Sequence, residues 1–281
     1  MTEERMRADL HIHTYYSDGG QSPADVIAAA KSRGVSLISV TDHDNCNARK
    51  EVKELAGKAG ITAVDGEEFS SYDGRVKVHI LGYGMDCTHP ALVAFNKRLY
   101  DGAEERGFDI LRNLAKAGIN ISYGEVVRER RCKKSPLHSV HIAIAGARKG
   151  YARSPYAFYD KYLSYGSVGF SLVRRPAPEE TVKVIVESGG FASLAHPARI
   201  SMDKDGGIGL LKRLTDCGLG GIEAVYSGHT AMDTQYYKEL AERFGVLVTG
   251  GSDTHHSEGN RCVGVPEFYP DAKLLSALKL I

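Results

Sequence analysis

Histidines and carboxylates recur along this chain in short clusters whose spacing turns several side chains the same way. The segment 9–14 reads DLHIHT, and alternate residues of a strand share a face, so His11 and His13 point together. Two imidazoles on one face can bind one metal ion. Asp18 follows in a Ser-Asp-Gly-Gly turn, from which its carboxylate can reach toward a second ion. The spacing therefore predicts metal chemistry.

Five further motifs repeat this chemistry. They are TDHD at 41–44, GEE at 66–68, a lone histidine at 79, AHP at 195–197 and SDTH at 252–255. Each alone has an ordinary interpretation: His79 fits a strand histidine, and Asp42 and Asp253 fit helix caps. Together they lie at the carboxyl ends of successive predicted strands. In α/β barrels the active site is built at the rim that these strand ends form. Imidazole mixed with carboxylate suits zinc, manganese or iron, so the set predicts a metal cluster.

The elements that must position these motifs alternate between strand and helix. β-type runs predict seven strands, at 7–13, 37–43, 61–68, 76–82, 191–196, 221–226 and 246–253. Helical patterns at 22–33, 47–59 and 232–244 lie between them, and Ser22 with Pro23 is a typical helix start. The alternation predicts an α/β fold with a parallel sheet or barrel. No Gly-x-Gly-x-x-Gly loop supports a dinucleotide-binding fold.

The middle of the chain lacks this alternation. Helical patterns at 91–117, 123–130 and 139–149 follow one another without a strand between them. We expect residues 1–87 and 179–281 to form the metal-binding barrel and 88–178 to form a helical insertion that caps it. A separate helical domain is the alternative, but the strands and motifs resume after residue 178, which favours an insertion.

Composition and charge narrow the class of protein. The 281 residues are 42% hydrophobic and 25% charged with a net charge of +1, so they indicate a globular protein without a nucleic-acid-binding charge excess. We expect a cytoplasmic location and no membrane contact, because no apolar run is long enough for a membrane helix or signal peptide. The five cysteines form no Cys-x-x-Cys pair, which leaves imidazoles and carboxylates as the metal ligands.

The ordered set D-x-H-x-H-T, T-D-H-D, G-x-E, a lone His, A-H-P and S-D-x-H resembles the PHP family, named for polymerase and histidinol phosphatase members. The motifs extend from residue 9 to residue 255, nearly the whole chain. The resemblance implies a distorted seven-stranded (β/α)7 barrel. The helical insertion resembles that of small bacterial members that act on nucleotides or RNA 5′ ends.

The resemblance also implies two or three divalent ions of manganese, iron or zinc. It assigns the first ion to His11, His13, Glu68 and Asp253. It assigns the second to Glu68, His79 and His196, with Glu68 bridging. It assigns the third to Asp18, His43 and His255. Family members often carry histidine where Asp18 stands, so the third position leaves the identity and occupancy of its ion open.

A metal-bridged hydroxide is expected to attack phosphorus. Asp18, His43 and His255 are the catalytic candidates, with either histidine or a metal-bound water as the proton donor to the leaving oxygen. Relatives carry R-x-H-[IF]-A in the insertion, whereas this chain reads SVHIA at 139–143, with Ser139 in place of the arginine. The residues expected to bind substrate are Arg131, Lys134, His141, Arg199 and His229.

The expected function is a metal-dependent phosphoesterase that hydrolyses phosphate monoesters or short 5′-phosphorylated nucleotides. A 3′,5′-bisphosphonucleotide phosphatase and a 5′-3′ oligoribonuclease are the leading forms. The alternatives are a histidinol-phosphate phosphatase and a non-catalytic module that only binds metal or nucleotide. The expected partner is a small phosphorylated substrate, with no obligate protein partner.

Overall fold

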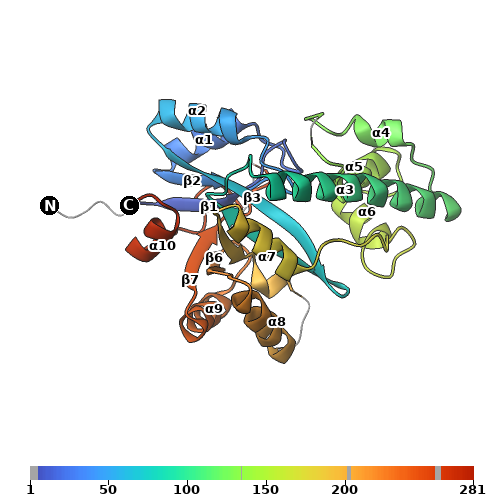
Figure 1. The fold of residues 1–281 in the computed structure, drawn as a ribbon. Helices are drawn as coiled ribbons and strands as arrows, with labels where there is room; N and C mark the ends of the chain where they lie inside the picture. Colours follow the sequence, from blue (N-terminus) through green and yellow to red (C-terminus); the bar gives the residue numbers. More distant parts are fainter. Residues whose placement is uncertain (1–5, 134, 201–203, 257–260) are drawn as a thin grey trace.

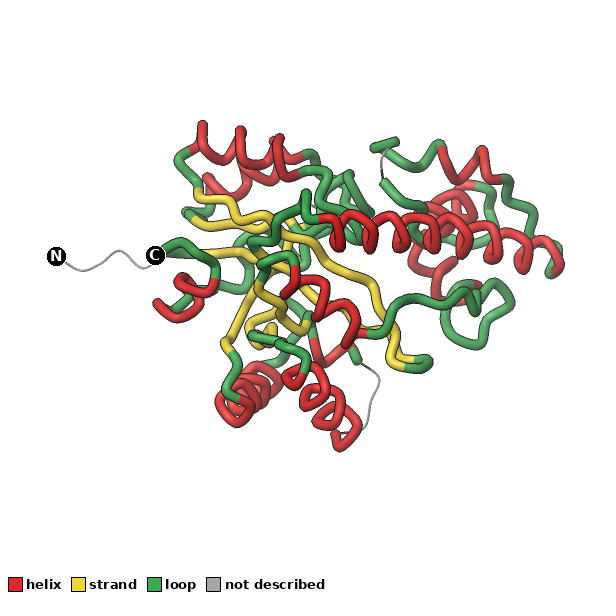
Figure 2. Tube along the Cα trace, viewed as in Figure 1, coloured by secondary structure: helices red, strands yellow, loops and turns green. Residues whose placement is uncertain are grey.

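Seven strands form one curved sheet at the centre of the molecule (Figures 1 and 2). The computed structural model describes residues 6–133, 135–200, 204–256 and 261–281, without side chains for 204–206. The strands are β1 (Ala8–Ile12), β2 (Leu37–Val40), β3 (Thr62–Asp73), β4 (Val76–Tyr83), β5 (Phe191–Leu194), β6 (Gly221–Tyr226) and β7 (Leu247–Gly251). All seven coincide with predicted strands.

The sheet follows chain order and nearly closes into a barrel. Neighbours pair from β1 to β7. The first and last strands meet where the His13 N–H donates to the Thr254 carbonyl at 3.0 Å and the Asp253 N–H donates to the His11 carbonyl at 2.8 Å. The (β/α)7-type barrel is therefore confirmed, and its closure brings the first and last metal motifs side by side.

One strand runs against the parallel arrangement that the sequence suggested. β4 pairs antiparallel with both β3 and β5, whereas the other neighbours pair parallel. The reason is a two-residue hairpin loop in which Gly74 takes a φ of +61°, a conformation that glycine adopts at little cost. As a result, Glu68 and His79 lie within long paired strands and not at strand ends.

Helices cover the outside of the barrel (Figure 1). They are α1 (Pro23–Ser32), α2 (Arg49–Ala59), α7 (Pro178–Glu187), α8 (Lys204–Asp216), α9 (Ala231–Phe244) and α10 (Ala272–Ala277), with the 3-10 turn η1 (Pro197–Arg199). The predicted cap of α1 is present, because Ser22 accepts from the Asp25 N–H and Asp25 accepts from the Ser22 N–H. Val26, Ile38 and Val52 are buried between α1, α2 and the sheet.

A group of helices lies between β4 and α7 in the chain and to one side of the barrel (Figure 2). They are α3 (Pro90–Lys116), α4 (Tyr123–Val127), α5 (Ser139–Arg148) and α6 (Pro155–Tyr162). Leu114, Ile142 and Phe158 belong to a hydrophobic cluster of their own. The domain boundaries at 88 and 178 stay a prediction. Among the described helices, none combines the length and apolar character that spanning a bilayer requires.

Candidate metal centre

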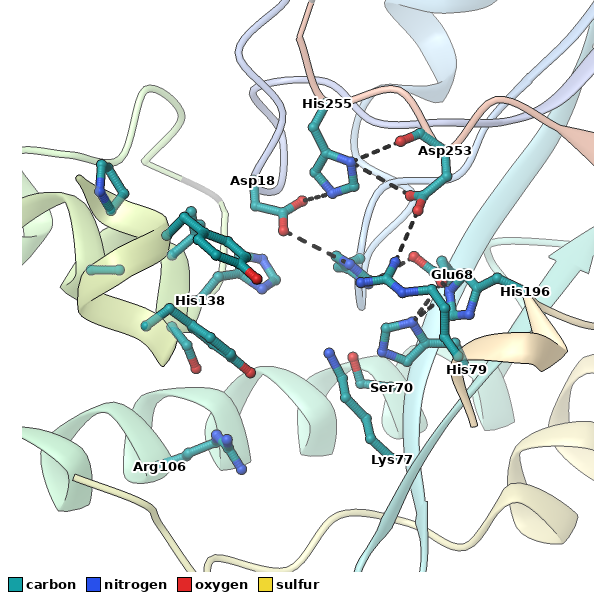
Figure 3. Close-up of a pocket in the computed structure, with 18 of the residues that line it drawn as sticks. Asp18, Glu68, Ser70, Lys77, His79, Arg106, His138, His196, Asp253 and His255 are labelled. Carbon is teal, nitrogen blue, oxygen red and sulfur yellow. Dashed lines mark hydrogen bonds and ion pairs between the residues drawn. The ribbon is translucent and has the colours of Figure 1, made fainter. Parts of the chain in front are cut away.

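The nine side chains predicted as metal ligands lie together at one end of the barrel. Figure 3 shows six of them, from Asp18 to His255, pointing toward a common centre. They come from β1, β3, β4 and the loops that follow β1, β2, β5 and β7. The full set is His11, His13, Asp18, His43, Glu68, His79, His196, Asp253 and His255.

The first group of ligand atoms is fully buried. His11, His13, Glu68 and Asp253 each offer an atom, and these atoms lie within 4.8 Å of one another. His13 Nε2 lies 3.1 Å from Glu68 Oε2 and 3.3 Å from Asp253 Oδ1. His11 Nε2 and His13 Nε2 face each other at 3.2 Å. Two imidazoles and two carboxylates at this spacing match the ligand set of a divalent transition metal.

Glu68 stands between two halves of the cluster. Its Oε1 lies 2.6 Å from His79 Nδ1 and 2.8 Å from His196 Nε2. Its Oε2 lies 3.1 Å from both His13 Nε2 and His43 Nδ1. Because each oxygen faces a different set of imidazoles, the geometry suits a carboxylate that bridges two ions.

The third group is the most accessible. Asp18 Oδ1 lies 3.3 Å from His255 Nε2 and 3.7 Å from His13 Nδ1, and Asp18 Oδ2 lies 3.8 Å from His43 Nε2. The side chains of Asp18 and His255 are 16% and 25% exposed, so this part of the cluster opens toward solvent. The structure adds His13 to this group beyond the three residues that the family resemblance implied.

Several buried polar atoms of the cluster have no hydrogen-bond partner among the described residues. They are His13 Nδ1, His43 Nδ1, Glu68 Oε2, His79 Nε2 and His196 Nδ1. The 3.1 Å contact between His43 Nδ1 and Glu68 Oε2 is close but does not have hydrogen-bond geometry. A buried polar atom without a partner costs about 1–3 kcal/mol, so proteins rarely leave several in one place. A bound cation would give this region the partner that it lacks, and the donor set therefore fits a metal centre.

Charges inside the cluster are strongly coupled. Burial opposes ionisation of Glu68, but the surrounding imidazoles outweigh burial and hold its pKa well below the usual range. Burial also opposes a charge on His11, yet the carboxylates of Glu223, Glu68 and Asp253 raise its pKa well above the usual value. His11 thus holds a proton that a bound metal ion would displace, because metals bind neutral imidazole, whereas burial lowers the pKa of His79 to about 3 and leaves that ring neutral.

Glu223 is a residue of the candidate site that the sequence analysis missed. This fully buried carboxylate accepts from His11 Nδ1 at 2.9 Å through Oε1 and from the His196 N–H at 2.7 Å through Oε2. The first contact leaves His11 Nε2 free to face the cluster, as outer carboxylates do for metal-binding histidines. The available signal was an ionisable residue in the middle of the apolar strand β6.

Backbone strain is concentrated at the same place. Asp44, His196 and Asp253 have positive φ angles of 55°, 27° and 52°. Such conformations cost about 1–3 kcal/mol for residues other than glycine and persist where the surroundings hold them. The hydrogen bonds from the His196 N–H to Glu223 and from the Asp253 N–H to the His11 carbonyl supply that restraint.

A pocket of about 890 Å³ opens beside the cluster. Seven of the nine candidate ligands, all but His11 and His13, line its inner end with Arg199, and Tyr156 and Tyr159 of the helical group line its outer part. Arg199 Nη1 donates to Asp253 Oδ2 at 3.1 Å and to the Tyr226 hydroxyl at 3.3 Å. Of the residues expected to bind substrate, Arg199 is the one that the structure places in the lining.

Other predicted substrate residues lie elsewhere. Arg131 donates to the Gly20 carbonyl, and His229 Nδ1 bonds to the Ala224 carbonyl at 3.0 Å, both outside the lining. His141 is buried behind the pocket, where its Nδ1 accepts from the His138 N–H at 3.1 Å. Lys134 lies outside the described residues.

His138, Lys77, Arg106 and Arg175 line the pocket instead. The sequence analysis did not single them out, because single basic residues on a helix, strand or loop resemble solvated surface residues. His138 is 8% exposed, and burial lowers its pKa to about 3. Its Nε2 has no hydrogen-bond partner among the described residues, so a neutral imidazole edge is available to a ligand.

Comparisons with a family model and with known sequences agree on the family of this chain. The family model described as "PHP domain" matches residues 9–152. A phosphoribosyl 1,2-cyclic phosphate 1,2-diphosphodiesterase of Eggerthella lenta is 34% identical over 90% of this chain and 96% of its own length. A 3′,5′-nucleoside bisphosphate phosphatase of Chromobacterium violaceum is 34% identical over 93% of this chain and 92% of its own length.

A solved structure agrees with these sequence matches. An amidohydrolase from Chromobacterium violaceum with bound sulfate superposes with a TM-score of 0.87 at 31% identity, over 96% of each chain. The similarity therefore covers both the barrel and the helical group, not the metal motifs alone.

Proposed function

Because the chain belongs to the PHP family and is a phosphoesterase, we propose that it hydrolyses a phosphate ester of a nucleotide or nucleotide-like sugar phosphate at the cluster around Glu68. One observation carries the proposal: nine ligand-type side chains lie together, and seven of them line the inner end of a pocket of about 890 Å³. That volume lies within the usual range for small-molecule sites.

We propose that the nine converging side chains hold two or three divalent ions of manganese, iron or zinc. Bound divalent ions supply the positive charge and the activated water that phosphoester hydrolysis needs at neutral pH. Glu223 fixes the orientation of His11, and Glu68 joins the two halves of the cluster. The protein's contribution is a rigid, largely buried cage, since His11, His13 and Glu68 have no solvent exposure.

The residues at the solvent-accessible edge of the cluster are assigned to proton transfer during hydrolysis. Asp18, His43 and His255 line the pocket, and His255 is the most exposed of the histidines that contact Asp18. His43 and His255 are the candidate proton donors to the leaving oxygen, and Asp18 orients them through contacts of 3.3–3.8 Å. His255 suits the role better: burial holds the pKa of His43 well below its usual value, whereas Asp18 and Asp253 outweigh burial and raise the pKa of His255. Arg199 stands beside Asp253, where a phosphate oxygen can meet its guanidinium.

The outer part of the pocket suits the remainder of a nucleotide. Tyr156 and Tyr159 present aromatic surface at the pocket, and their side chains are 81% and 38% exposed. Nucleobases stack on such exposed rings with little dependence on sequence. This arrangement supports a mononucleotide or a short oligonucleotide as the substrate.

A hydrolysis screen with Mn²⁺ tests the proposal. It compares 3′-phosphoadenosine 5′-phosphate, a 5′-phosphorylated dinucleotide, 5-phosphoribosyl 1,2-cyclic phosphate, histidinol phosphate and p-nitrophenyl phosphate. We expect turnover of at least one of the first three to exceed turnover of the last two. The cyclic sugar phosphate is a second candidate because the Eggerthella lenta relative is named for it.

Matched variants link turnover to the cluster. Asp253→Asn removes a buried ligand carboxylate and should lower kcat/KM at least about 100-fold, since loss of an outer partner of a metal ligand already costs up to that much. Asp216→Asn changes an exposed surface carboxylate and should leave kcat/KM unchanged. Metal binding without turnover of any phosphate ester would support the non-catalytic alternative. Full activity of Asp253→Asn would refute the assignment of this site.

A further inference from the structure

The cations that line the pocket fall into two classes. Arg199 and Arg261 lie 3.1 Å and 3.6 Å from Asp253, and Arg175 lies 3.3 Å from Asp44. Lys77 and Arg106 also line the pocket, but within the described residues no carboxylate lies at ion-pair distance from either. Among the described arginines and lysines that line the pocket, Lys77 and Arg106 are therefore the two without a carboxylate partner.

The register of β3 and β4 places this charge away from the metal ligands. Ser70 pairs with His79, and two residues further from Glu68, Tyr72 pairs with Lys77. A strand rises about 3.3–3.4 Å per residue, so the Tyr72–Lys77 pair lies about 13 Å along the strand from Glu68. Figure 3 shows Lys77 and Arg106 on the side of the pocket opposite Asp18 and His255.

Arg106 comes from α3 and is only 7% exposed. Its Nε has no hydrogen-bond partner among the described residues, and its guanidinium lies over the Phe170 ring at 6.0 Å. Burial alone would raise the pKa of the Tyr72 hydroxyl, but Arg106, Lys77 and Arg175 outweigh burial and lower that pKa. A buried arginine without a carboxylate is unfavourable unless a ligand supplies the negative charge.

We propose that Arg106 and Lys77, with the Tyr72 hydroxyl, form a second anion subsite that binds a non-reacting phosphate of the substrate. This inference rests on the proposed function, because it requires that a first phosphate reacts at the metal cluster. Guanidinium and ammonium groups are the usual protein partners of phosphate. The substrate class is accordingly a molecule with two phosphate groups at opposite ends of the pocket.

The proposed subsite should affect which substrate is preferred and not the rate of the chemical step. The second phosphate contacts Arg106 and Lys77 in the ground state and in the transition state alike, so its loss raises KM more than it lowers kcat. A substrate with one phosphate gains little from these cations. The preference for bisphosphorylated over monophosphorylated substrates therefore measures the subsite.

The test compares two substrates on the Mn²⁺-loaded enzyme. 3′-Phosphoadenosine 5′-phosphate carries two phosphates and p-nitrophenyl phosphate carries one. We expect Lys77→Gln and Arg106→Gln each to lower the ratio of their kcat/KM values about tenfold to hundredfold, mainly through KM of the bisphosphate. Arg112→Gln is the control, because Arg112 lies on the same helix, is 63% exposed and pairs with Asp109; its ratio should match the wild type.

The outcomes separate the two proposals. If wild-type enzyme with bound Mn²⁺ hydrolyses no phosphate ester, the proposed function fails. If it hydrolyses both substrates and both variants keep the wild-type ratio, or lower both kcat/KM values equally, the second subsite is refuted and the proposed function stands. Thermal denaturation checks that Arg106→Gln folds. If that variant does not fold, Lys77→Gln alone tests the subsite, because Lys77 is exposed and its replacement should not affect folding.

Discussion

Replacing Glu223 by glutamine tests how strictly the buried carboxylate controls the metal centre. Glu223 accepts two hydrogen bonds, from His11 Nδ1 at 2.9 Å and from the His196 N–H at 2.7 Å. Glutamine keeps the shape but has one acceptor oxygen and one donor nitrogen. If its oxygen accepts from His196, its NH₂ group faces His11 Nδ1. His11 must then carry its proton on Nε2, the atom that faces the cluster.

The expected effect follows from this mismatch. A proton on His11 Nε2 blocks that atom as a ligand, and the opposite amide orientation leaves the buried His196 N–H without an acceptor, at about 1–3 kcal/mol. Loss of an outer hydrogen bond to a metal-binding histidine weakens metal affinity or activity about 10–100-fold. This range equals about 1.4–2.7 kcal/mol at 25 °C, consistent with one lost buried contact.

The assay is a competition titration of Mn²⁺ against a chelator, with metal content measured on the purified protein and kcat/KM measured at saturating Mn²⁺. Glu239→Gln is the matched control, because Glu239 is exposed on α9. An Mn²⁺ affinity of Glu223→Gln within twofold of wild type, with unchanged activity, would show that the carboxylate does not orient His11.

Other predictions concern protons, metal removal and packing. Burial lowers the pKa of His13, but Asp253 and Glu68 outweigh it and raise the pKa to about 10, so His13 is protonated in the metal-free protein at pH 7. This raised pKa stabilises the metal-free fold below about pH 6.5 and ceases to do so as pH rises through about 10. Mn²⁺ binding should therefore release at least one proton at pH 7, and affinity should increase with pH; calorimetry in buffers of different ionisation heats detects this, and a buffer-independent heat would contradict it. Chelation should lower the melting temperature, since an ion at 100 times its Kd contributes about 2.7 kcal/mol; an unchanged melting curve would argue against bound metal. Gly251→Ala places a Cβ 2.4 Å from His11 Cβ and should destabilise the fold by about 1–3 kcal/mol, whereas Gly57→Ala, with open space around it, should not destabilise the fold; equal melting temperatures would refute the packing argument.

The sequence alone determined the chemistry of the centre and most of the elements that carry it. Alternation within DLHIHT predicted a shared face for His11 and His13, and the structure brings their Nε2 atoms to 3.2 Å. Such local patterns are readable because strand periodicity and helix caps depend on near neighbours in the chain. The ordered motifs predicted the family, and the match over residues 9–152 confirms it.

Only the tertiary structure decided which distant residues complete the site. Strand direction is not encoded in alternation, so the antiparallel β4, which pairs His79 with Ser70, was missed. Arg106 has the pattern of a surface helix residue, and only packing of α3 against the barrel makes it a pocket residue with 7% exposure. Glu223 contacts His11 across 212 residues of sequence. Contacts of this kind depend on barrel closure and helix packing, whose energies are summed over the whole chain. The spacing of residues that are near in sequence therefore cannot predict them.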